Sequence, residues 1–134
     1  MENILNRIGL TTRQTFLVAV MGVILWFAAA MLIRVLAPMG AFEGMARVWL
    51  YLLVIPGTVP FVPLIAWFAG LPRERIAIGV AVSAATATFC DGVALAWFPA
   101  LYASTVDHVA AAGAVILWGV GVVVAIGCWF NRQA

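Results

Sequence analysis

The sequence contains no lysine, a single histidine and few charged residues of any kind. Charged residues make up 9% of its 134 residues, whereas soluble domains carry about 25%. The positive charge comes from seven scattered arginines, and the net charge is +2. The chain therefore has no basic cluster of the kind that binds nucleic acid or acidic lipid headgroups, and we expect no nucleic-acid partner.

Residues for metal, haem or nucleophilic chemistry are also scarce. The single histidine, His108, lies at the edge of an apolar segment, so two histidines of one chain cannot hold a haem. Cys90 and Cys128 fall at predicted depths about 20 Å apart, which is too far for a disulfide. No Ser-His-carboxylate triad and no glycine-rich phosphate loop can be placed. We expect no metal, no cofactor and no enzymatic activity.

Apolar residues, by contrast, make up 66% of the chain, and the mean hydropathy is +1.16. They gather in four segments, at residues 14–36, 48–69, 76–98 and 108–130. Segments of about 20 residues span the hydrocarbon core of a bilayer, and they do so as helices because lipid offers no partner for unpaired backbone groups. We predict an all-α integral membrane protein, with residues 1–134 forming a single four-helix transmembrane bundle with short loops.

The arginines predict the orientation of this bundle. Five of them flank the ends that share a side with the chain termini: Arg7, Arg13, Arg73, Arg75 and Arg132. Only Arg34 and Arg47 lie toward the other side. Because arginine is retained in the cytoplasm, we predict that both termini are cytoplasmic. Aromatic residues fit interfacial belts, with Trp49, Tyr51, Trp97 and Tyr102 at the outer boundary and Trp67 and Trp129 at the inner one.

Polar residues of the outer loops have structural interpretations. Glu43 stands four residues before Arg47, the spacing of a helical ion pair. Ser104 and Asp107 have the spacing of a capping box that opens the last helix. His108 follows them as a residue at the interfacial start of that helix.

The third apolar segment carries small residues at every fourth position. One line holds Gly79, Ser83, Ala87 and Asp91, and the next holds Ala84, Thr88, Gly92 and Ala96. Such lines let neighbouring helix backbones approach closely in a membrane. We therefore expect the third helix to be the most buried of the four.

Asp91 is the one carboxylate deep within an apolar segment. A charge at that depth costs about 2.5 to 3.5 kcal/mol on insertion scales, so Asp91 needs a partner or a proton. Helical rise places Trp26, Thr58 and Trp118 near its level, with Thr88 as a further donor and Arg34 within reach from above. We predict that these residues form an intramembrane polar cluster around Asp91.

The second segment contains a helix-breaking run over residues 55–63. Pro56, Pro60 and Pro63 each remove a backbone donor, and Gly57 adds freedom beside the first of them. We predict a kink or break there. Carbonyl oxygens freed by the break must find side chains, water or a ligand.

Two interpretations of Asp91 stay open. In the first, Arg34, Trp118 or the second helix satisfies the carboxylate, which then only specifies how the helices pack. In the second, Asp91 lines a small water-accessible cavity beside the broken helix and binds a proton, a cation or a cationic solute. Contact with another subunit is a third use of the same residues.

The second half of the chain resembles a known family. Asp91-Gly92, then Trp97-Phe98-Pro99 at a helix end and Trp118-Gly119-Val120-Gly121 in the last segment are similar to a group of small four-helix bacterial membrane proteins of unknown function. The first half is similar mainly by hydropathy. The resemblance implies four spans in a bacterial inner membrane and supplies no activity. Small multidrug exporters differ, because their first helix carries a glutamate that is absent here.

We expect a small non-enzymatic protein of the bacterial inner membrane, a structural or accessory subunit whose partners are the lipid bilayer and either further copies of itself or a larger membrane complex. The alternative is a small transporter or channel for a proton, a cation or a cationic solute that uses Asp91.

Overall fold

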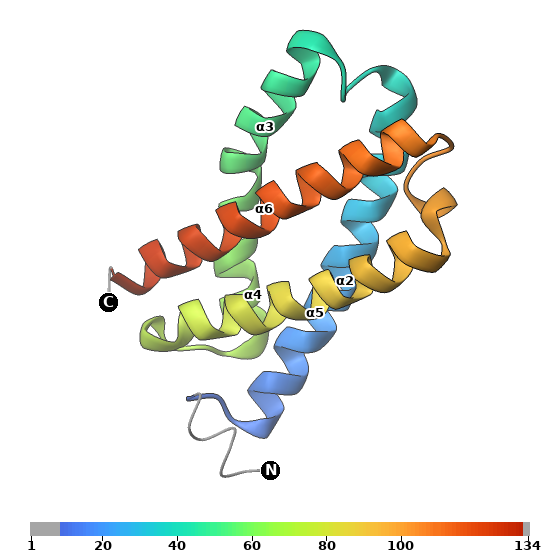
Figure 1. The fold of residues 1–134 in the computed structure, drawn as a ribbon. Coiled ribbons are helices and arrows are strands. Elements are labelled where there is room, and N and C mark those ends of the chain that lie inside the picture. The colour runs from blue at the N-terminus through green and yellow to red at the C-terminus, as the bar shows by residue number, and fades with distance from the viewer. Residues whose placement is uncertain (1–8, 133–134) are drawn as a thin grey trace.

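A computed structural model describes residues 9–132, which form helices joined by short turns (Figure 1). The long helices are α2 (Thr12–Leu36), α3 (Gly44–Thr58), α4 (Phe61–Ala69), α5 (Ile76–Trp97) and α6 (Val106–Arg132), and the 3-10 turns are η1 (Ala37–Met39), η2 (Arg73–Arg75) and η3 (Pro99–Leu101). No strand occurs in this part of the chain. The predicted all-helical class is confirmed.

Four stretches are long and apolar enough to cross a membrane: Thr12–Met39, Gly44–Ala69, Arg73–Trp97 and Val106–Asn131. Each overlaps one of the four segments predicted from hydropathy. The second stretch is divided within the helix-breaking run at residues 55–63. Helix α3 ends at Thr58 and α4 begins at Phe61. Pro56 lies inside α3, Pro60 precedes the first residue of α4, and Pro63 lies in the first turn of α4, where backbone N–H groups have no partner within the helix.

The Gln14 side chain forms hydrogen bonds at the start of α2 and at the end of α4. Thr11 Oγ1 accepts a 3.1 Å hydrogen bond from the Gln14 backbone, and Gln14 Oε1 accepts one of 3.1 Å from the Thr11 backbone. Gln14 Nε2 also donates to the carbonyl of Gly70 over 3.2 Å. Gly70 ends α4 with φ at +65°, the left-handed conformation that favours glycine after a helix. The start of α2 and the end of α4 are thereby joined.

The start of α5 and the end of α6 meet at the same end of the bundle. The Asn131 side chain accepts a 3.2 Å hydrogen bond from the Ala77 backbone, which supplies an N–H group in the first turn of α5 with a partner from another helix. The first and last described helices therefore begin and end on one side.

Small residues set the distance between α5 and its neighbours, and α5 packs most extensively against α2 and α6. A Cβ atom at Gly22 of α2 would lie 2.4 Å from the Ser83 carbonyl oxygen of α5, and one at Gly127 of α6 would lie 3.1 Å from Val80. Of the two predicted small-residue lines, the one with Gly79, Ser83 and Asp91 is buried. The other line ends in Gly92 and Ala96, which are exposed.

The buried residues form two separate clusters, one toward each end of the bundle. The lower cluster, near the start of α2, contains Leu10, Val18, Met21, Val62, Ile65, Ala69, Ile76 and Val80. The upper cluster, near η1 and η3, contains Ala30, Ile33, Ala37, Phe42, Ala94, Tyr102, Ala103, Ala112 and Val115.

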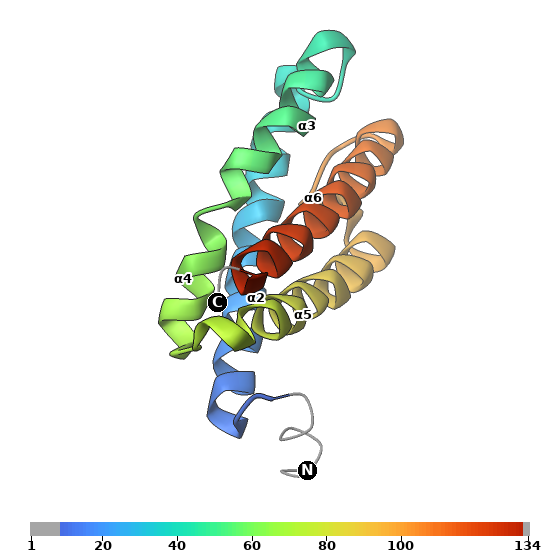
Figure 2. The same cartoon turned by 90° about the vertical axis from the view of Figure 1, so that its left-hand side faces the viewer.

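Helix α3 is the least enclosed of the long helices. None of its residues is buried, and its main neighbour is α6. In Figure 1, α6 crosses in front of α2 and of the α3–α4 segment, and Figure 2 shows α5 and α6 running side by side. The end of α2 and the start of α3 are joined by a short turn, and the two helices diverge from it, since α3 is not among the main neighbours of α2.

Candidate functional site

Asp91 lies in the last third of α5 and only 8% of its surface is exposed. Its line on α5 also holds Ser83, at 2% exposure, and Gly79, so this face of α5 is the one turned into the bundle. The sequence places the carboxylate on this face because small residues at every fourth position favour close packing there. Asp91 is therefore held where its oxygens need partners from other segments.

Tyr102 is the partner of Asp91. Its hydroxyl donates a 2.5 Å hydrogen bond to Asp91 Oδ1 and accepts a 2.9 Å hydrogen bond from Trp26 Nε1. Tyr102 is completely buried. Three segments thus meet at one hydroxyl: α2 through Trp26, α5 through Asp91 and the turn after η3 through Tyr102. We call this set the Trp26–Tyr102–Asp91 network.

The network depends on a protonated tyrosine. Burial raises the pKa of the Tyr102 hydroxyl above its ordinary value, and the hydrogen bond to Asp91 raises it further. Tyr102 lies between the third and fourth candidate spans. The hydroxyl therefore remains a donor throughout the physiological pH range.

The sequence predicts Tyr102 near the outer membrane boundary and does not include it in the cluster. In the structure Tyr102 is completely buried within the bundle and belongs to the cluster. Its position follows from the chain reversal after α5, where Pro99 opens η3 and brings residue 102 back beside residue 91. A buried carboxylate followed by a proline-containing turn and a tyrosine is the signal that points to this pairing.

Arg34 does not pair with Asp91. It is exposed near the end of α2 and lines a small cavity of about 160 Å³ with Pro38, Ser104 and His108. No ion pair within residues 9–132 joins it to Asp91. Helical rise explains why Arg34 does not reach Asp91. Trp26 lies at the level of Asp91, and Arg34 lies eight residues, or about 12 Å, further along α2.

Trp118 and the two threonines make other contacts. Trp118 Nε1 donates to the Tyr51 carbonyl over 3.0 Å, and the two rings lie 5.6 Å apart, so Trp118 joins α6 to α3. Thr88 Oγ1 donates to Ala84 of its own helix over 2.8 Å. Thr58 Oγ1 donates to Ile55 over 3.0 Å, at the end of α3. Of the predicted cluster, only Trp26 reaches Asp91 through a hydrogen-bonded chain.

A cavity of about 470 Å³ lies beside Asp91. It is lined by residues of α2, α3, α5 and α6 and by Phe61 and Ile65 of α4, and it is open on one side. Its lining is almost entirely apolar, and the polar side chains among the lining residues are Asp91, Ser83, Thr58 and Trp26. Gly57 of the proline run also lines it, so the divergence of α3 from α2 and the break before α4 shape this space.

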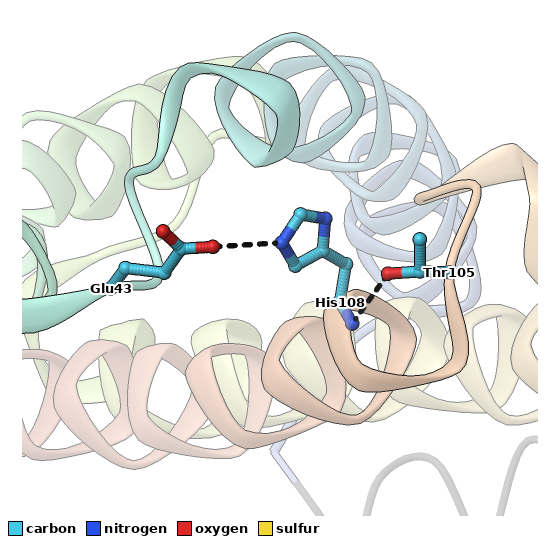
Figure 3. A network of polar contacts seen from close by, with 3 residues as sticks. All are labelled: Glu43, Thr105 and His108. Atoms are coloured by element: carbon cyan, nitrogen blue, oxygen red, sulfur yellow. Dashed lines mark hydrogen bonds and ion pairs between the residues drawn. The ribbon is translucent and has the colours of Figure 1, made fainter.

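A second polar arrangement joins the loop before α3 to the start of α6. In Figure 3 the side chains of Glu43 and His108 point toward one another, with Glu43 Oε1 and His108 Nε2 3.4 Å apart. Glu43 precedes the first residue of α3 in an extended conformation and faces His108 instead of forming the predicted pair with Arg47. Thr105 Oγ1 accepts a 3.2 Å hydrogen bond from the His108 backbone. The residue that caps α6 is therefore Thr105, and not Ser104 as predicted from the sequence.

The contact between Glu43 and His108 lies beside packed aromatic side chains. The Phe42 and His108 rings meet edge to face at 6.1 Å, next to the upper buried cluster. Within residues 9–132, no three side chains of the metal-binding types lie together.

No family model, no curated protein and no solved structure matches the chain. The resemblance to small four-helix bacterial membrane proteins therefore stays a prediction.

Proposed function

We propose that the chain is a small non-enzymatic membrane protein that serves as a structural or accessory subunit. The observation that carries this proposal is the Trp26–Tyr102–Asp91 network, in which the one deep carboxylate is engaged in joining α2, α5 and the turn after η3. A buried polar group used in this way specifies packing. The short turns leave no extramembrane domain within residues 9–132 that would carry a separate activity.

Helix α3 supports a role in assembly. It buries none of its residues within the chain and exposes Met45, Val48 and Leu52. Transmembrane helices that lack neighbours in their own chain pack against lipid or against another membrane helix. We propose that this face meets the bilayer and a partner, either a second copy or a larger complex.

The location belongs to the same proposal. The arginine distribution favours cytoplasmic termini, and the family resemblance favours a bacterial inner membrane. The start of α2 contacts the end of α4, and the start of α5 contacts the end of α6, at one end of the bundle. This arrangement supports an even number of membrane crossings.

Purification in a mild detergent tests this proposal. A stoichiometric partner or a homo-oligomer should be recovered, and Leu52→Trp on α3 should weaken that association. Val93→Trp, also at an exposed valine or leucine position but on α5, is the matched control. A protein that is strictly monomeric and free of partners in native membranes would contradict the accessory role.

A second function is favoured by the cavity beside Asp91. It is a small transporter or channel for a proton, a cation or a cationic solute. Asp91→Asn, which removes charge and keeps shape, separates the two functions in proteoliposomes. Loss of a substrate flux with unchanged thermal stability would favour transport, whereas loss of stability without any flux to lose would favour packing.

A further inference from the structure

We propose that the cavity beside Asp91 is a binding site for a lipophilic organic cation, an amine or quaternary ammonium with an apolar body. This inference goes beyond the accessory role. It gives the second function a ligand class but requires only binding, so it stands or falls separately from transport.

The size and lining of the cavity fit such a ligand. Its volume is about 470 Å³, within the range of roughly 300–1,000 Å³ typical of small-molecule sites. Leu25, Val54, Ile116 and Val120 are among the apolar residues that line it. Small-molecule sites combine such walls with a few polar groups that fix the ligand's orientation. Here those groups are Asp91 and Ser83 of α5, Trp26 of α2 and Thr58 of α3.

The charge of the site selects a cation. Asp91 lines the cavity and is more than nine-tenths buried, with 8% of its surface exposed. Its hydrogen-bond donor Tyr102 is neutral, and the ion pairs within residues 9–132 do not include Asp91. A ligand cation would supply the opposite charge that no side chain of the described bundle provides.

Trp26 adds to the same selectivity. Its indole lines the cavity, while its N–H is turned to Tyr102. An indole ring attracts a cation near its face, most strongly where water is excluded. The network therefore brings a carboxylate and an indole together in the lining of an apolar space.

The route of entry also fits a lipophilic molecule. Leu32 of α2 and Leu53 of α3 both line the cavity and are more than half exposed. They belong to the two helices that diverge, so the opening between them faces the surroundings of the bundle. A ligand dissolved in the hydrocarbon region can enter there without crossing a polar barrier.

Binding of 4-phenylbutyltrimethylammonium tests the proposal. The protein is embedded in phosphatidylcholine nanodiscs and compared with empty nanodiscs by equilibrium dialysis. The reference compound is the uncharged isostere in which carbon replaces the ammonium nitrogen. Wild-type protein should bind the cation at least about tenfold more tightly than the isostere, after subtraction of partition into lipid, because only the cation meets Asp91.

Two variants locate the site. Asp91→Asn should remove most of the preference for the cation while leaving binding of the isostere unchanged. Ala29→Phe, at a cavity-lining position of α2, should weaken binding of both compounds. Ala96→Phe, at an exposed alanine of α5 outside the cavity, is the matched control and should change neither.

Three results would overturn the proposal. The first is equal binding of cation and isostere to the wild-type protein, which would indicate a site for apolar chains such as lipid tails. The second is a preference that survives in a folded Asp91→Asn variant. The third is no binding above that of empty nanodiscs. Proteoliposome flux is measured separately, so binding without flux would retain the site and reject transport.

Discussion

The hydroxyl of Tyr102 donates a hydrogen bond to Asp91 Oδ1, and this contact holds the turn after η3 inside the bundle. The two residues are eleven positions apart, on either side of the chain reversal at Pro99. Since Tyr102 is completely buried, its hydroxyl has exchanged water for two side chains. The Tyr102 hydroxyl therefore joins α2 and α5 to the turn after η3.

Tyr102→Phe should destabilise the protein by about 1–3 kcal/mol, because Asp91 and Trp26 would both lose a buried partner. Reversible unfolding in mixed micelles measures the change. Tyr51→Phe is the control, since Tyr51 contacts Trp118 through its backbone carbonyl and that bond remains. Equal stability of the Tyr102→Phe variant and the wild type would show that the network contributes nothing to the fold.

Gly22→Ala should disrupt the contact between α2 and α5. The added Cβ would lie 2.4 Å from the Ser83 carbonyl oxygen, a backbone atom that cannot rotate away. Overpacking of this kind costs about 1–3 kcal/mol. Gly121→Ala is the matched control because nothing lies within 4 Å of its Cβ position, and it should be neutral or slightly stabilising. The measurement is thermal unfolding in detergent, and equal melting of both variants would refute the close approach.

Tyr102 should resist ionisation at alkaline pH. Its pKa in the folded protein is raised above the value of about 10 for an unfolded chain. The protonated hydroxyl therefore contributes stability below pH 10, and this contribution is lost as the pH rises through the folded pKa. The tyrosinate absorbance of the wild type minus that of Tyr102→Phe should stay flat at pH 10 and rise only above it. A difference curve with its midpoint near pH 10 would contradict burial of the hydroxyl.

Asn131 should behave as a cap for a helix other than its own. Asn131→Ala removes the acceptor for the Ala77 backbone N–H and should cost about 0.5–2 kcal/mol. Asn131→Asp keeps an acceptor at the same place and adds a charge that favours a helix N-terminus, so it should retain stability. Chemical denaturation in micelles compares the two. A loss in Asn131→Asp as large as that in Asn131→Ala would show that the cap is unimportant.

The four apolar stretches and the burial of Asp91 could be predicted from the sequence because hydropathy and the expense of a deep charge act locally along the chain. Helical rise also placed Trp26 at the level of Asp91. The same calculation gave the level of Trp118 but not its direction, and Trp118 faces Tyr51 on α3. Depth along a helix is therefore predictable where rotation about its axis is not.

The position of Tyr102 could not be obtained from such depths. Tyrosine near a helix end is typical of a membrane interface, and only the path of the chain through η3 turns this one inward. The same holds for Glu43 and His108, which are 65 positions apart and meet because two loops lie side by side (Figure 3). Contacts made by turns depend on tertiary geometry that periodicity does not encode.

The most direct test of the account is whether the chain crosses the membrane between its turns. Met39 in η1 and Glu74 in η2 are both exposed, and the second candidate span separates them. Single-cysteine variants Met39→Cys and Glu74→Cys are made with Cys90 and Cys128 replaced by alanine, and intact cells are treated with a membrane-impermeant maleimide. We predict labelling of Met39→Cys alone, with Glu74→Cys labelled only after permeabilisation. Equal labelling of both variants in intact cells would contradict the four-span membrane architecture.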